Sequence, residues 1–403
     1  MLLIGIDQSH KKHDICIIDP SGRQLAREVV AHHSAGFQRI HHLCQQFQVS
    51  PEECPVALES GHSLLVDHLL DLHYPVYVVP GKAVDRYRDR HRQSRSRSDS
   101  GDALVLAHVL RTDRDQYLPL EADMPLTRQI CSQVQVARNL KRNIVRFGNQ
   151  LRSLLWRYYP IASHLFSQLD QMISLSFIQA YPTPQAAKRL TLDQFTAFCH
   201  TNRYWRSDYI ARRYAQLANA ESSASPEVAD AYAPQAQTLA RVLLYLVRER
   251  EAAQKLLTQA FERHPDAFVF ASLPGAGEFL APALLSKFRD CRSRFPTPAV
   301  AQAIAGTSPV TSQSGQRKRV LFRLACDREF RYIASQFARS SVTESSWAAA
   351  YFDSVQSRLA KKSQAYRCLA NRWIAIIWRL WTDRVAYDEK VHLQNRFVHR
   401  ERS

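Results

Sequence analysis

The chain has 403 residues, 45% of them hydrophobic, which is enough to build more than one core and excludes a wholly disordered protein. Lysine and arginine (54) outnumber aspartate and glutamate (37), and the net charge of +17 indicates a polyanionic partner, most simply nucleic acid. No stretch reaches the roughly 18–20 apolar residues of a membrane span, and the N-terminus lacks the order of a signal peptide. The sequence therefore predicts a cytoplasmic protein with no membrane partner.

The eight cysteines are scattered along the chain, and no two have the CxxC spacing of a zinc or redox site. The 16 histidines include no HExxH motif and no paired Cys/His spacing. We expect reduced, mostly buried cysteines, no disulfides and no structural zinc.

The first hundred residues alternate strand and helix patterns. Short apolar runs predict strands at LLIGID, HDICIID, QLAREVVA, PVALES and PVYVVP. Helical spacing is present at 36–47, in SLLVDHLLDLHY and in SDSGDALVLAHVLRT, which begins with capping-type residues. Three hairpin-linked strands followed by βαβ units indicate an α/β domain with a mixed sheet and helices on its faces.

A basic segment, RYRDRHRQSRSR at 86–97, separates the fifth strand from the last of these helices. It has no apolar period, so we expect a loop or a conditionally ordered segment. Its arginines suit phosphates and stacked bases, and a solvated linker is the alternative. These arginines are Arg86, Arg88, Arg90, Arg92, Arg95 and Arg97.

The middle of the chain is predicted to be mainly helical. Residues 126–159 have the pattern of a long amphipathic helix with a basic polar face, and 236–261 have a second such pattern. The intervening 160–234 look less regular, with prolines as breaks. The two long helices suggest an antiparallel pair or a coiled-coil arm, and either would also suit oligomerisation.

The C-terminal third begins with FVFASLPGAGEFLAPALLSKF, two helical halves around the PGAG turn at 274–277. Two interpretations stay open: a helix-hairpin-helix whose glycine turn offers backbone N–H groups to a phosphate, or a plain connection between helices. The segment 346–385 is predicted to be helical, with four tryptophans as core residues: Trp347, Trp373, Trp378 and Trp381.

Four carboxylates stand at the ends of predicted elements. Asp7 ends the first strand and Glu59 the fourth, while Asp99 and Asp102 begin a helix and share one of its faces. If they converge, they offer oxygen ligands to Mg²⁺ or Mn²⁺, and two such cations about 3.5–4 Å apart clamp the attacking and leaving oxygens of a phosphodiester. Each acid also has a structural alternative, such as a strand-end turn, an arginine ion pair or a helix N-cap.

The segments GIDQSHKKHDICIID, ALESGHSLLVDHL and RSDSGDALVLAHVL resemble the DEDD transposase family, which includes the Piv DNA invertase. That family has a RuvC-like, RNase-H-type N-terminal domain. Matched residue by residue, the resemblance makes Asp7, Glu59, Asp99 and Asp102 the catalytic acids and metal ligands. Before the third acid this chain has Arg-Ser where the family usually has Lys-Thr.

A second segment, AGTSPVTSQSGQRKRVLFRLAC, resembles the family's C-terminal block, in which a serine beside a glycine follows a proline. The resemblance implies that Ser314 is a nucleophile, with Ser312 in reserve. Without it, the segment is a polar loop followed by a basic helix or strand. The cations available to neutralise a phosphate are Arg317, Lys318, Arg319 and Arg323.

The resemblance covers roughly residues 1–115 and 265–385 and implies an α/β RNase-H-like (RuvC-like) domain, a helical or coiled-coil middle and a mostly α C-terminal transposase domain. The expected boundaries are 1–120 for the RuvC-like catalytic domain, 121–263 for the coiled-coil or linker region, 264–390 for the transposase domain and 391–403 for a basic tail.

The function implied is that of a transposase or site-specific recombinase of an insertion sequence, which exchanges strands through a phosphoserine link in a composite site. Members of this type are guided by a structured RNA encoded by the element. We therefore expect double-stranded donor and target DNA, a guide RNA and a homodimer or homotetramer, since two duplexes must be cut in concert.

Two other functions stay open from the residues. A RuvC-like nuclease of the Holliday-junction type would hydrolyse DNA without a covalent intermediate. A non-catalytic nucleic-acid-binding protein would use the acids only structurally, and metal would then be irrelevant to it.

Overall fold

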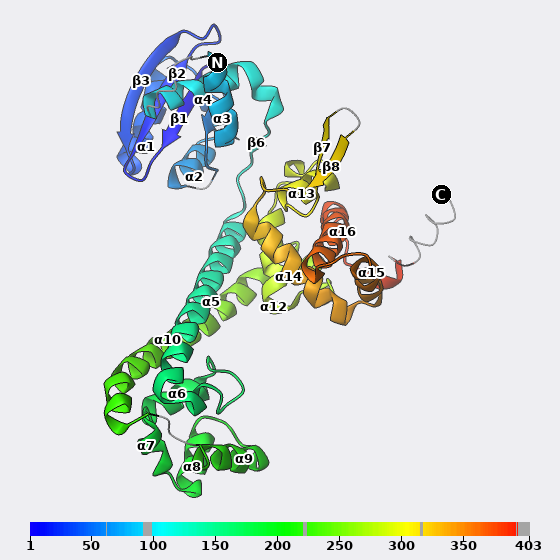
Figure 1. The fold of residues 1–403 in the computed structure, drawn as a ribbon. Helices are drawn as coiled ribbons and strands as arrows, with labels where there is room; N and C mark the ends of the chain where they lie inside the picture. Colours follow the sequence, from blue (N-terminus) through cyan, green and yellow to red (C-terminus); the bar gives the residue numbers. More distant parts are fainter. Residues whose placement is uncertain (62, 92–98, 221–223, 315–316, 392, 394–403) are drawn as a thin grey trace. The chain divides into compact units, whose positions relative to one another are not determined.

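The computed structural model describes residues 1–403 except 62, 92–98, 221–223, 315–316, 392 and 394–403 (Figure 1). The chain forms two compact units. Unit 1 comprises Met1–Met124 and Asp290–Val300, and unit 2 comprises Pro125–Arg289 and Ala301–Ser403. The three domains and tail expected from the sequence are a finer division, and their boundaries stay a prediction.

Unit 1 is built on a six-stranded mixed sheet of order β3-β2-β1-β4-β5-β6. The first three strands form an antiparallel meander, β4 and β5 run parallel to β1, and β6 is antiparallel to β5. All five predicted strands are present. The sixth has only two residues, which is too short for an alternating pattern. The strands are β1 (Leu3–Gln8), β2 (Lys12–Ile18), β3 (Gln24–Ala31), β4 (Val56–Leu58), β5 (Val76–Val78) and β6 (Pro119–Leu120).

Four helices cover the two faces of this sheet. On β1, alternation sends Ile4 and Ile6 into one buried cluster and Leu3 into another. The first cluster includes residues of α1 and α2, and the second includes residues of α3 and α4. The helices are α1 (Ser34–Gln46), α2 (Leu64–Asp71), α3 (Gly81–His91) and α4 (Asp99–Asp113), and short 3-10 turns lie at Pro51–Glu53 and Arg114–Gln116.

The loop predicted from residue 86 is wrong as far as residue 91, because α3 continues to His91. Val84 and Arg88 lie one turn apart on α3 and are both buried, Arg88 being 8% exposed. An arginine whose charge is paired can occupy a core position that a search for apolar periodicity assigns to solvent. The remainder of the basic segment, 92–97, lies outside the described residues.

Gly5 allows α4 to lie directly against β1. A Cβ atom at this position would be 1.9 Å from the carbonyl oxygen of Ala103 and 2.5 Å from the amide nitrogen of Ala107. Both contacts are with backbone, which cannot rotate away as a side chain can. The close packing of α4 on the sheet therefore depends on the absence of a side chain at Gly5.

We expect Gly5→Ala to lower the free energy of unfolding by about 3 kcal/mol or more, because overpacking against backbone forces the helix off the sheet. Urea unfolding followed by circular dichroism measures the change. Gly148→Ala is the matched control, because a Cβ there has nothing within 4 Å. It lies inside a helix, where alanine should stabilise by roughly 0.5–1 kcal/mol. Equal stability of the two variants would contradict the prediction.

Unit 2 contains two long helices, α5 (Pro125–Tyr158) and α10 (Pro226–Glu262), which pack side by side (Figure 1). They are antiparallel: at the end of α5, Tyr158 stacks on Tyr232 near the start of α10, with ring centres 6.1 Å apart. The second helix begins ten residues earlier than predicted and includes Pro234. Ser225 caps it by accepting a hydrogen bond from the amide of Val228, which fixes the start ahead of the proline.

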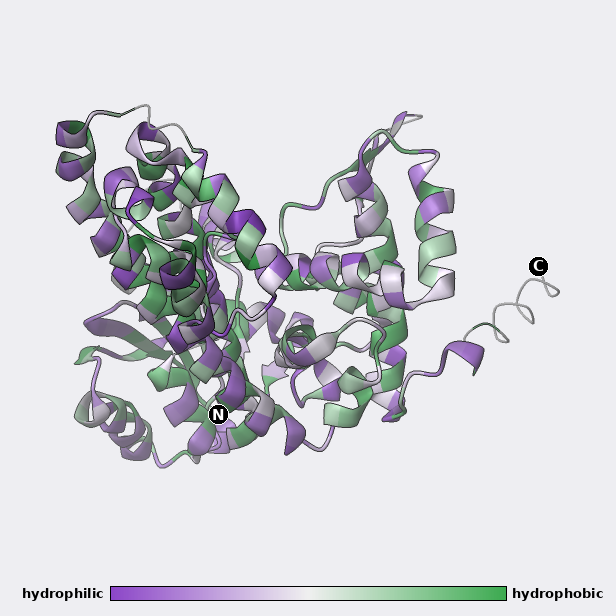
Figure 2. Cartoon of the chain, turned by 90° about the horizontal axis from the view of Figure 1, so that it is seen from below, coloured by the Kyte–Doolittle hydropathy of each residue, from purple (hydrophilic) through white to green (hydrophobic). Residues whose placement is uncertain are grey.

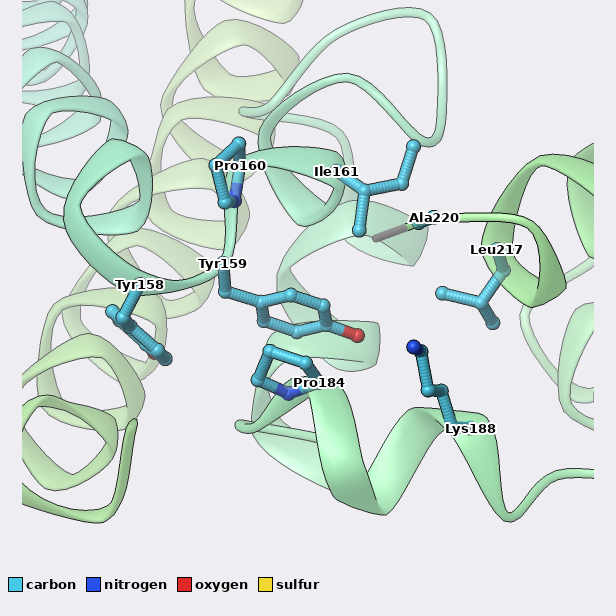
Figure 3. Close-up of a pocket in the computed structure, with 8 residues that line it drawn as sticks. All are labelled: Tyr158, Tyr159, Pro160, Ile161, Pro184, Lys188, Leu217 and Ala220. Carbon is cyan, nitrogen blue, oxygen red and sulfur yellow. The ribbon is translucent and has the colours of Figure 1, made fainter. Parts of the chain in front are cut away.

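The segment 160–234, which looks less regular in sequence, contains short helices: α6 (Met172–Ala180), α7 (Pro184–Lys188), α8 (Leu192–Thr201) and α9 (Ser207–Ala218), after a 3-10 turn at Pro160–Ser163. They share one core with α5 and α10. Figure 3 shows Tyr159 in this core, its hydroxyl pointing toward Leu217 and Lys188. Burial raises the pKa of Tyr159. The cavity beside it is about 10 Å³, room for one water at most.

The rest of unit 2 is a second helical core with one β-hairpin. The predicted tryptophans Trp347, Trp373 and Trp381 are buried, whereas Trp378 is partly exposed. The elements are α11 (Ala267–Ala271), α12 (Gly277–Phe288), α13 (Pro298–Ile304), β7 (Val310–Ser314), β8 (Arg317–Leu321), α14 (Arg328–Glu344), α15 (Ser346–Gln356) and α16 (Lys362–Asp383). The 3-10 turn at Arg292–Arg294 belongs to unit 1. α13 spans the boundary between the two units.

Helices of both units carry hydrophilic and hydrophobic residues side by side (Figure 2). On α5, the buried positions Ile130, Val134 and Ala137 recur every three or four residues, and the intervening positions are largely polar or basic. Within the described ranges, no helix is both long enough and apolar enough to cross a membrane.

Candidate active site

The start of α4 and the end of β1 lie together in unit 1. Arg114, just after α4, contacts the sulfur of Met1 at 3.4 Å, and Gly5 faces the middle of the helix. Strand and helix therefore run in opposite directions. Asp7, on the same face of β1 as Gly5, is directed to the end of α4 at which Asp99 and Asp102 lie.

Glu59 follows β4, the parallel neighbour of β1. The register pairs Ile6 with Leu58, so Asp7 and Glu59 are each the next residue after a paired position. The Glu59 side chain is exposed, and its Oε2 atom would lie 3.2 Å from a Cβ placed on Gly81, the first residue of α3. The structure thus brings the ends of two neighbouring strands and the starts of two helices to one edge of the sheet. That the four acids form one metal site there stays a prediction.

Arg88 of α3 holds the side chain of Asp102. Its Nη2 atom donates to Asp102 Oδ1 at 2.5 Å, and its Nη1 atom donates to Asp85 Oδ1 at 2.9 Å. Burial disfavours the charged guanidinium, but the two aspartates outweigh it and raise the pKa of Arg88. Arg88 therefore has an ion-pair role in this structure, in place of the exposed phosphate contact that the sequence predicts.

The other predicted residues of this region are described to different extents. Asp99 is the first residue of α4, but its side chain, like that of Arg90, lies outside the described part. Arg86 is exposed on α3. Arg92, Arg95 and Arg97 lie outside the described residues.

Asp14 is a carboxylate beside the candidate site that the sequence analysis did not single out. It is the cross-strand partner of Asp7 and is 7% exposed, with its Oδ2 atom 3.7 Å from Lys12 Nζ. Directly opposed residues of an antiparallel pair share a face of the sheet. In the sequence, Asp14 lies inside the apolar strand pattern HDICIID, a position where aspartate is uncommon. That position could have identified it.

The carboxylates of this edge have the donor chemistry that Mg²⁺ and Mn²⁺ require. Among the residues whose side chains are described, no three His, Cys, Asp or Glu groups are close enough to form a ligand set. Asp99 is outside that comparison, and Asp102 is engaged by Arg88. The residues fit a divalent cation by their chemistry, and Arg88 occupies one of the two carboxylate oxygens of Asp102.

The second predicted motif forms the β7–β8 hairpin of unit 2. Ser314 is the last residue of β7 and pairs with Arg317, while Ser312 pairs with Arg319. Ser312, Arg317 and Arg319 are exposed, and the side chains of Ser314 and Lys318 are outside the described part. The predicted nucleophile therefore lies next to the hairpin turn, with a basic strand beside it.

The base of this hairpin is fixed by arginines. The guanidinium carbons of Arg331 and Arg367 lie 4.5 and 4.3 Å from the ring centre of Phe322. Burial and the neighbouring Arg331 lower the pKa of Arg367. Arg323, predicted to neutralise a phosphate, instead donates to the carbonyl oxygens of Ser308 and Pro309 at 3.2 and 3.3 Å. These contacts anchor the hairpin on the helical core.

Comparisons with known proteins match both regions. A family model of DEDD-type IS110 transposases covers residues 4–160, and a model described as transposase, IS116/IS110/IS902 family, covers residues 268–353. The first span includes all four predicted acids, and the second includes the hairpin with Ser314.

Relatives extend the match over nearly the whole chain. A Streptomyces coelicolor protein named as the mini-circle transposase for IS117 is 31% identical over 96% of this chain and 95% of its own length. An IS900 protein of 42 kDa from Mycobacterium paratuberculosis is 22% identical over 95% of this chain and 96% of its length. An IS110 protein of 43.6 kDa from Streptomyces coelicolor is 23% identical over 78% of each.

An identity of 31% along almost the full length of both chains, together with two family models in the expected order, is decisive. The DEDD-type model also supports an RNase-H-like fold for the six-stranded sheet with helices on both faces. The chain belongs to the IS110 family of DNA transposases.

Proposed function

We propose that this transposase cuts and rejoins DNA through a covalent phosphoserine intermediate, using the acids of unit 1 and Ser314 of unit 2. The observation that carries the proposal is the convergence of Asp7, Glu59 and the start of α4 at one edge of an RNase-H-like sheet. Carboxylates in this arrangement would hold Mg²⁺ or Mn²⁺ through Asp7, Glu59, Asp99 and Asp102. When bound, the cation supplies charge neutralisation at the reacting phosphate.

The reaction conserves the energy of the phosphodiester. The Oγ atom of Ser314 forms a bond to phosphorus while the bond from phosphorus to one strand oxygen breaks. The proton of the serine hydroxyl ends on the released strand oxygen. A hydroxyl of the second strand then attacks the phosphoserine and restores the serine. Arg317 and Arg319, which pair with Ser314 and Ser312 across the hairpin, would neutralise the phosphate.

The proposed partners follow from charge and mechanism. A net charge of +17 favours nucleic acid, and exposed Arg86 on α3 is available to contact it. We propose donor and target duplexes as substrates, an element-encoded guide RNA that selects them by base pairing, and a dimer or tetramer that cuts two duplexes together.

The test uses the full chain, purified with RNA from cells that express the whole element, together with labelled donor and target DNA and Mg²⁺. After denaturation, DNA linked to protein is the expected result, and its loss on metal chelation is expected too. Cleavage without linked DNA would replace the proposal by a hydrolytic nuclease of the Holliday-junction type. Binding without cleavage in the presence of the RNA would make it a non-catalytic binding protein.

Arg88 competes with metal for Asp102 under this proposal. We expect Arg88→Met to tighten Mn²⁺ binding at least about fivefold, because the substitution frees Asp102 Oδ1 and removes a positive charge that repels the cation. Titration followed by electron paramagnetic resonance of free Mn²⁺ measures it. Arg86→Met is the control, with the same charge change on an exposed position of the same helix. Weaker binding by Arg88→Met than by this control would mean that Arg88 supports the site.

A further inference from the structure

A cavity of about 900 Å³ lies in unit 2 between α5, α14 and the turn before α12. Four cations of α5 line it, and each lies within about one helical turn of the next: Arg138, Lys141, Arg142 and Arg146. Lys141, Arg142 and Arg146 are exposed, and no carboxylate of the described chain forms an ion pair with them. A concentration of unpaired positive charge in a concave site attracts an anion.

Among the described residues, Glu278 in the first turn of α12 is the one acid that lines the cavity. Arg138 is already paired with Glu329, so three cations remain for a ligand. No side chain caps α12, and Gly275, before the helix, and Gly277, its first residue, have φ of +73° and +54°. The amides at the start of α12 therefore add to the positive potential of the cavity.

The cavity is also partly aromatic. Tyr332 of α14 is 44% exposed, and the guanidinium carbon of Arg138 lies 5.3 Å from its ring centre, which restrains the ring. Phe279 lines the cavity from α12. Exposed rings beside arginines provide stacking surfaces for nucleic-acid bases, and a base can reach such a ring only when it is unpaired.

A second cavity of about 490 Å³ continues this surface. The two cavities share Lys141, Glu278 and Phe279, and the second adds Arg250 and Lys255 of α10. Both lie within unit 2. The second cavity also has two acids in its lining, Glu251 and Glu278, against the three cations Lys141, Arg250 and Lys255. Positive charge therefore predominates in both cavities, and we expect room for more than one phosphate along them.

We propose that these two cavities bind unpaired nucleotides of a single-stranded segment, with phosphates on Lys141, Arg142 and Arg146 and a base stacked on Tyr332. The inference rests on the proposed function, in which the chain binds nucleic acid, and it assigns part of that binding to these two cavities. A paired duplex presents its phosphates on a convex surface and its bases inside, so it suits a concave, partly aromatic site poorly.

The experiment measures binding of the full chain to labelled single strands of RNA and DNA and to a duplex of equal length, by fluorescence anisotropy over a range of salt. Arg142→Ala with Arg146→Ala should weaken single-strand binding at least tenfold and reduce the slope of log Kd against log salt by about 1.4, since two phosphate contacts are lost. Arg152→Ala with Arg157→Ala is the matched control, removing two exposed charges of the same helix outside both cavities.

Tyr332→Leu separates stacking from charge. It should weaken single-strand binding at least about fivefold without changing the salt slope, and duplex binding should be unaffected. The proposal would be overturned if the Arg142/Arg146 and Arg152/Arg157 double variants lost single-strand affinity equally. It would also be overturned if Tyr332→Leu bound single strands like wild type. Tighter binding of either RNA or DNA supports it and identifies the source of the strand. Failure of the wild-type chain to bind any nucleic acid would overturn the proposed function as well.

Discussion

Replacing Asp102 by asparagine should lower the rate of DNA strand cleavage roughly a thousandfold, with DNA binding retained. The variant has nearly the same shape and still offers an oxygen to Arg88, so folding should be preserved. It lacks the charge that a divalent cation needs. Metal stabilisation of a phosphoryl transition state is worth several kcal/mol, and each 1.4 kcal/mol is about tenfold in rate.

The control for this variant is Asp85→Asn. Asp85 contacts the same arginine at 2.9 Å but has a side chain 48% exposed on α3. It removes the same charge from the same ion-pair network, and cleavage should stay close to wild type. If both variants lose activity equally, the role of Asp102 is to neutralise Arg88. If neither does, the acid site is not catalytic.

Replacing Ser314 by alanine should abolish protein-linked DNA and reduce strand exchange more than roughly ten-thousandfold, as removal of a covalent nucleophile does in other enzymes. Ser314 lies at the end of β7 beside the hairpin turn, where the loss of one hydroxyl leaves the strand pairing unchanged. Denaturing electrophoresis of labelled DNA gives the readout.

Ser312→Ala is the matched control, with the same substitution two residues earlier on the same strand and therefore on the same face. Adducts should persist in it. Adducts that persist in Ser314→Ala and disappear in Ser312→Ala would transfer the role to Ser312. Adducts in both variants would require a nucleophile other than either serine.

Local pattern predicted most elements of unit 1, but it missed α3 and β6. Alternating apolar runs predicted five of the six strands, and the capping residues before DALVLAHVL predicted α4. Patterns of this kind are local, because strand and helix periods arise from neighbouring residues. They also placed Asp7 and Glu59 at strand ends, while the assignment of four particular acids depended on the family resemblance.

The errors at Arg88 and Asp14 have one physical origin, which is that burial was inferred from apolarity. Arg88 occupies a core position because Asp85 and Asp102 neutralise it, and these partners come from two helices. In the segment 160–234, the prolines were interpreted as breaks, although the short helices there are stabilised by a core shared with α5 and α10. Asp14 was overlooked, as Arg88 was, because a charged residue was not expected to be buried.

The sequence by itself determined the period of each element, the large positive charge and the acid and serine motifs, since these depend only on residue type and spacing. Only the tertiary structure decided that Arg88 lies on Asp102, that Asp14 stands opposite Asp7, and that the cations of α5 surround a cavity with Tyr332. Contacts of this kind join residues far apart in the chain, so they exist only once the strands and helices have packed.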